Sequence, residues 1–64
     1  MPSSAPELSS LAATVEELVH RLAPIGATYE ADHREDLASG VHEVERSLGN
    51  ALRRLNRLIA TPGA

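Results

Sequence analysis

The 64-residue sequence has no cysteine, no tryptophan and no phenylalanine, and Tyr29 is its single aromatic residue. Without cysteine the chain can form no disulfide, no thiolate zinc site and no cysteine nucleophile. Its large aliphatic side chains are nine Leu, four Val and two Ile. A chain this short is near the lower limit for building a sufficient hydrophobic core alone. We therefore expect self-association to supply the missing stability.

Long hydrophobic runs are also missing. No apolar stretch approaches the roughly 20 residues that a transmembrane helix needs. The opening segment, MPSSAPELSS, has no basic region followed by an apolar run, as a secretory signal would. We expect a cytoplasmic protein that does not bind membranes. The frequent use of Ala, Arg and Leu is typical of GC-rich bacteria and favours a bacterial origin.

Large aliphatic residues recur every three or four positions, which places them on one face of an α-helix. The pattern predicts a first helix over about residues 6–22 and a second over about residues 29–60. Twelve residues are expected to form the core and the interface with a partner: Leu8, Leu11, Val15, Leu18, Leu22, Leu37, Val41, Val44, Leu48, Leu52, Leu55 and Ile59.

The predicted first helix has a recognisable start. Ser4 is a hydroxyl cap, Pro6 lies in the first turn, and the carboxylate of Glu7 is three residues after the cap. Residues 1–5 and 61–64, at the two ends of the chain, are expected to be disordered.

A loop is predicted over residues 23–28. Pro24 disfavours helical conformation in the residue before it, and Gly26 can adopt a positive φ. Thr28 is the favoured cap of the second helix, and Asp32 followed by Glu35 is a competing start. A connection this short normally joins antiparallel neighbours. The predicted fold class is therefore all-α, an antiparallel two-helix hairpin.

The predicted helices differ in length. At 1.5 Å per residue the second would be about 45 Å long and the first about 26 Å. The first helix would then leave part of the second uncovered, which is another reason to expect a partner. We expect the hairpin to form a homodimer that is a four-helix bundle, and to bind another protein as well.

The net charge of −3 is unevenly distributed. Residues 1–45 contain all nine acidic residues but only two arginines, whereas residues 46–64 contain no acid and four arginines: Arg46, Arg53, Arg54 and Arg57. Acids at the start of a helix and arginines at its end both complement the helix dipole. The four arginines are also candidates for contact with a partner or a phosphate. Antiparallel pairing of two copies would bring the acidic and basic ends together.

Two Glu-x-x-His pairs, Glu17 with His20 and Glu30 with His33, have the spacing of ligands in di-iron helical bundles. Surface positions explain both pairs, because the ligands of such bundles face inward and these residues lie off the aliphatic stripe. We therefore predict no metal site and no cofactor. A lone hairpin also lacks the water-excluding pocket that catalysis requires, so we expect no enzyme activity.

These features favour a small helical protein–protein interaction module, such as a self-associating adaptor, a docking element or a regulatory subunit. One alternative is a nucleic-acid-associated regulator or antitoxin-like protein that uses the arginines of the second helix. Binding to nucleic acid is less favoured, since the acidic remainder of the chain would repel phosphates. The other alternative is a bundle that binds metal through Glu and His.

Overall fold

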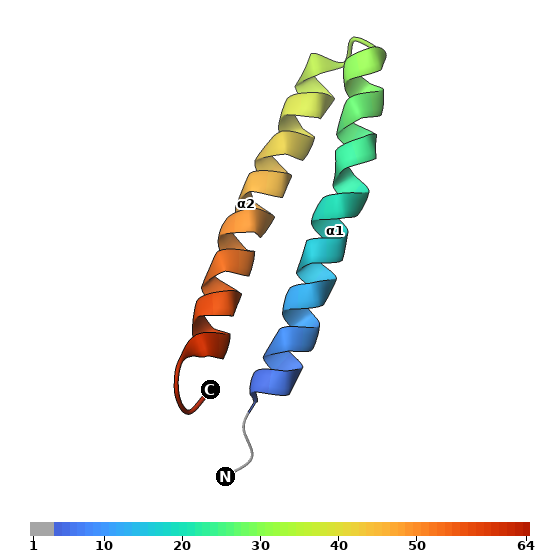
Figure 1. Ribbon diagram of the computed structural model, residues 1–64. Coiled ribbons are helices and arrows are strands. Elements are labelled where there is room, and N and C mark those ends of the chain that lie inside the picture. Colours follow the sequence, from blue (N-terminus) through green and yellow to red (C-terminus); the bar gives the residue numbers. More distant parts are fainter. Residues whose placement is uncertain (1–3) are drawn as a thin grey trace.

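The computed structural model describes residues 4–64, which form two α-helices joined by a short turn (Figure 1). Helix α1 spans Ala5–Ala31 and helix α2 spans Glu35–Ala60. The helices lie side by side and run antiparallel. The prediction of an all-α hairpin is therefore confirmed. Within residues 4–64, neither helix has the combination of length and apolar character that crossing a bilayer requires.

The two ends of the described chain meet at the open end of the hairpin. Ser4 is the N-cap residue of α1, as predicted, but its side chain makes no capping hydrogen bond. Its backbone N–H instead donates to the carbonyl of Ala64 at 2.7 Å. Residues 61–64, predicted to be disordered, form a turn that returns to the start of α1. Residues 1–3 of the predicted disordered N-terminus lie outside the described residues.

Helix α1 does not stop at the predicted loop over residues 23–28. It continues through Pro24 for seven more residues, to Ala31. Proline in a helix interior removes one backbone hydrogen bond and costs about 3 kcal/mol. Pro24 lies on the exposed side of α1, and the hydroxyl of Thr28 donates to its carbonyl at 2.9 Å. Thr28 therefore lies inside α1 and forms a hydrogen bond within that helix. The prediction that it caps α2 is wrong.

The chain reverses direction at residues 32–34. The N–H of His33 donates to the carbonyl of Glu30, and the N–H of Arg34 donates to the carbonyl of Tyr29. This pair of hydrogen bonds defines a Schellman motif, in which the residue after the C-cap is left-handed. His33 fills that position with a φ of 59°, where glycine is usual. Gly26, predicted to take a positive φ, is helical and buried instead.

The two helices are of nearly equal length, with 27 and 26 residues, so the expected mismatch between them is wrong. Their contact surface, which we call the seam, follows a repeat of three and four positions in each helix. The seam residues are Leu8, Ala12, Val15, Val19, Leu22, Gly26 and Tyr29 of α1, and Ala38, Val41, Glu45, Leu48, Leu52, Leu55 and Ile59 of α2.

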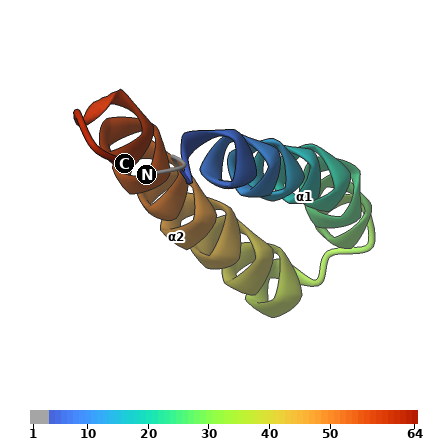
Figure 2. The ribbon, with the colours of Figure 1, turned by 90° about the horizontal axis from the view of Figure 1, so that it is seen from below.

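Burial along the seam is complete only at its small residues. Ala12, Gly26 and Ala38 are buried, whereas the larger seam residues are half-buried. Seen from below, the helices form a single layer, and no third element of the described residues 4–64 covers it (Figure 2). Within residues 4–64 no large side chain is fully buried. The hairpin alone therefore has a seam but no enclosed core.

The turn predicts a stabilising substitution. Replacing His33 with Gly removes a side chain from a left-handed position, at the cost of a more flexible unfolded chain. We expect H33G to raise the free energy of unfolding by about 0.5–1 kcal/mol. Thermal denaturation followed by circular dichroism measures the change, and an unchanged or lower melting temperature would contradict the assignment of this turn.

Substitutions at two helical glycines, Gly26 and Gly49, are expected to change stability in opposite directions. A Cβ on Gly26 would lie 3.2 Å from Cγ1 of Val41, whereas no atom lies within 4 Å of a Cβ on Gly49. We expect Gly26→Leu to overpack the seam and to lower stability by about 1–3 kcal/mol. Gly49→Ala should raise stability by about 0.5–1 kcal/mol through helix propensity. Urea titration of both variants checks the pair, and equal tolerance at the two positions would show that α1 and α2 do not approach closely at Gly26.

Candidate functional site

The seam divides the rest of the hairpin surface into two flanks of different chemistry. Because the helices are antiparallel, residues that follow the seam by one position in each helix lie on the same side of the rod, and residues that precede it lie on the other. The polar flank consists of Ser9, Glu16, Ala23, Glu30, His42, Gly49 and Asn56. The apolar flank consists of Leu11, Leu18, Ile25, Leu37, Val44, Ala51 and Leu58.

A histidine joins the two helices across the polar flank. Nε2 of His42 in α2 lies 2.7 Å from Oε1 of Glu30 in α1, at hydrogen-bond distance. Nδ1 of His42 lies 3.4 Å from Oε1 of Glu45, one turn along the same helix. Glu45 occupies a seam position, and its Oε1 is buried without a hydrogen bond in the described part of the chain. Both ring nitrogens therefore face carboxylates, an arrangement that suits the doubly protonated imidazolium.

The two carboxylates affect the protonation of His42. The hydrogen bond to Glu30 raises the pKa of His42 above its usual value, and the charges of Glu30 and Glu45 act in the same direction. Near the turn, the side chain of Arg34 holds the pKa of Asp36 below its usual value through a bidentate contact with distances of 3.2 and 3.3 Å. The polar flank therefore contains the ion pair that joins the two helices, and the turn contains the ion pair at the start of α2.

The apolar flank is a row of aliphatic side chains left in contact with water. Its six large residues are between 38% and 52% exposed. They recur every seven positions on each helix, with Leu11, Leu18 and Ile25 on α1. In the register set by Gly26 against Val41, they alternate between the helices along the rod. The result is a row of exposed aliphatic side chains on a single side of the hairpin.

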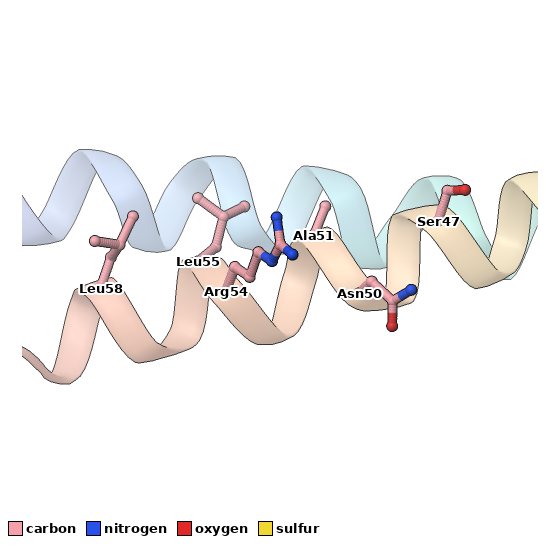
Figure 3. A pocket seen from close by; sticks show the side chains of 6 residues that line it. All are labelled: Ser47, Asn50, Ala51, Arg54, Leu55 and Leu58. Carbon is pink, nitrogen blue, oxygen red and sulfur yellow. The ribbon is translucent and has the colours of Figure 1, made fainter.

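The apolar flank is hollowed where its smallest member lies. A groove of about 440 Å³ surrounds Ala51 and is lined by Ser47, Asn50, Ala51, Arg54, Leu55 and Leu58 (Figure 3). Leu55 and Leu58 project to the same side of α2 as Ala51, and Arg54 reaches along the groove toward Ala51. The groove therefore combines the apolar side chains of Ala51, Leu55 and Leu58 with the polar side chains of Ser47, Asn50 and Arg54.

The structure separates the twelve predicted interface residues into two groups. Eight lie in the seam: Leu8, Val15, Leu22, Val41, Leu48, Leu52, Leu55 and Ile59. Four lie on the apolar flank: Leu11, Leu18, Leu37 and Val44. The sequence interpretation missed two large residues of this flank, Ile25 and Leu58. Their step of seven from Leu18 and from Ala51 could have indicated them.

The predicted Glu-x-x-His pairs do not come together as ligand sets. Glu30 contacts His42, while His33 lies in the turn. Glu17 and His20 are exposed on α1. No group of three or more His, Cys, Asp or Glu within residues 4–64 could hold a metal ion.

The four candidate arginines are all exposed on α2 and differ in their surroundings. The guanidinium of Arg53 donates to the side-chain oxygen of Asn50. Arg54 lines the groove, whereas Arg57 lies in the last turn, where it complements the helix dipole. Arg54 is therefore the arginine that borders the apolar flank.

The pair between Glu30 and His42 predicts a pH dependence. Since the folded-state pKa of His42 is raised, the pair contributes fully to stability below the usual pKa of histidine and is lost as the pH rises through the raised value. We expect the melting temperature of the native chain, compared with that of H42Q, to fall from about pH 6 to about pH 8. The control is H20Q, at an exposed site of α1, which should keep the native pH profile. Parallel profiles for the native chain and H42Q would exclude this contribution.

Comparison of the chain with protein-family models, with curated proteins and with solved structures finds no match. What the hairpin does must therefore be inferred from the chemistry of its seam and its two flanks.

Proposed function

We propose that this chain is a small helical protein–protein interaction module that acts through its apolar flank. The observation that supports this role best is the row of half-exposed aliphatic side chains on one side of the hairpin. Monomeric proteins rarely expose contiguous apolar patches larger than a few hundred Å². A surface of this kind is typical of a site that another helical surface covers.

The energetics favour association. Full burial of a large aliphatic side chain contributes about 1.5–3 kcal/mol to stability. In the hairpin alone, about half of the surface of each large flank residue is still exposed. Most seam residues are also only half-buried, so a second layer of helices would remove water from the seam and the flank together. Association would thus stabilise the fold and constitute the function.

The groove around Ala51 indicates the shape of the partner. The groove is open and lies on α2 alone, with the small Ala51 beside Leu55 and Leu58, so side chains of a facing helix can pack over Ala51. We therefore propose a helical partner with an aliphatic face, in a four-helix arrangement. The module would serve as an adaptor, a docking element or a regulatory subunit, with no catalytic step of its own.

Charge on the apolar flank tests this role. We expect L18D, at the middle of the flank in α1, to reduce the mass in solution to that of the 6.8 kDa monomer and to lower helicity. A buried unpaired carboxylate costs several kcal/mol, which is enough to disrupt an interface of this size. Light scattering after size exclusion, with circular dichroism on the same samples, measures both effects over a range of concentrations.

The matched control is A23D, which places the same acid at an exposed position of the polar flank in α1. It should retain the mass and the helicity of the native chain. If L18D and A23D both behave as the native chain does, the apolar flank is not an association surface and the proposed function fails.

A further inference from the structure

We propose that a second copy of this chain covers the apolar flank with its turn at the opposite end of the rod. In this arrangement α2 of each copy packs antiparallel against α2 of the other, and α1 packs against α1. The inference rests on the proposed function and names its partner and its geometry.

The hairpin exposes more surface than a compact monomer of its mass, and the excess is close to the area that one partner buries in a dimer interface. The chain exposes 4909 Å², whereas a compact monomer of 6.8 kDa is expected to expose about 4,000 Å². Its radius of gyration is 15.1 Å, against about 11 Å for a compact domain of this length. The excess of about 900 Å² is close to the roughly 800 Å² that each partner buries in a standard interface.

The border of the apolar flank on α2 allows close approach of a second α2. Gly40, Ser47 and Arg54 follow each other at steps of seven along this border, and no atom lies within 4 Å of a Cβ on Gly40. Ser47 is at the middle of Glu35–Ala60, so antiparallel pairing about this point brings the two Ser47 residues together. The same pairing places each Arg54 level with Gly40 of the second copy, where a long side chain finds space.

Charge selects between the two possible orientations. The half of the hairpin next to the turn, residues 18–47, contains six acids and three arginines, a net charge of −3. The other described half contains three acids and three arginines, a net charge of zero. Turns at the same end would bring the two negative halves together. Turns at opposite ends place each negative half against a neutral one.

The opposite-end arrangement also adds attraction along α2. Antiparallel pairing about Ser47 brings Arg57 within one residue of the level of Asp36 in the second copy. Charges at the rim of an interface fix orientation more than they add affinity, and salt screens them over about 8 Å at physiological ionic strength. The apolar flank thus supplies the association, and the charges on α2 set its direction.

A single cysteine tests the orientation, because the native chain has none. We expect Ser47→Cys, treated with a short thiol-specific bismaleimide at low protein concentration, to give a covalent dimer in high yield. The control is Ser39→Cys, an equally exposed position of α2 on the side away from the flank. It should remain largely uncrosslinked under the same conditions. Denaturing gel electrophoresis and mass spectrometry measure the yield.

Two results would overturn the proposal. If the chain is dimeric by light scattering, but Ser47→Cys crosslinks only when mixed with Arg21→Cys chains, the turns lie at the same end. This orientation would bring Ser47 level with Arg21 of the other copy, and the proposed function would stand. If the native chain is monomeric at all concentrations, no second copy covers the flank and the inference fails, and the proposed function then requires a different helical protein as the partner.

Discussion

The two helices pack together because small residues let their backbones approach closely. Ala12, Gly26 and Ala38 are buried, and a Cβ on Gly26 would already press on Val41. Small residues on one helix let larger residues of the other lie against its backbone. The seam can therefore hold the hairpin although no large side chain in the described part is fully buried. Its position fixes which residues are left for the two flanks.

The two flanks lie one residue before and one residue after seam positions, on opposite sides of the hairpin. One flank is polar and the other is apolar. On the polar flank, His42 contacts Glu30 across the helices, and Glu45 brings a carboxylate into the seam itself. On the apolar flank, large aliphatic residues alternate along the rod, and nothing in the described part of the chain covers them. A molecule with one wet side and one apolar side has a preferred direction for association. The proposed function depends on that asymmetry.

The turn shows how tertiary contacts outweigh a local preference. Pro24 costs about 3 kcal/mol in a helix interior, which favoured a stop before it. The seven residues beyond it include Ile25, Gly26 and Tyr29, which continue the flank and the seam. Contacts with α2 along this segment offset the proline penalty, so the chain turns only at His33. A short stretch of sequence contains the proline penalty but not the contacts with α2. For that reason the predicted first helix ended nine residues, or about two and a half turns, too early.

The sequence by itself determined that the chain is helical, that α1 begins after Ser4, that α2 ends near Ala60, and that both helices have an aliphatic face. These features depend on periodicity, capping and end signals, all of which are local. Helix packing was needed to reveal the place of the turn, the separation of aliphatic residues into seam and flank, and the contact of His42 with Glu30. Each of these depends on the rotation of one helix against the other. Close approach at Gly26 and Ala38 sets that rotation, and neither helix contains this information alone.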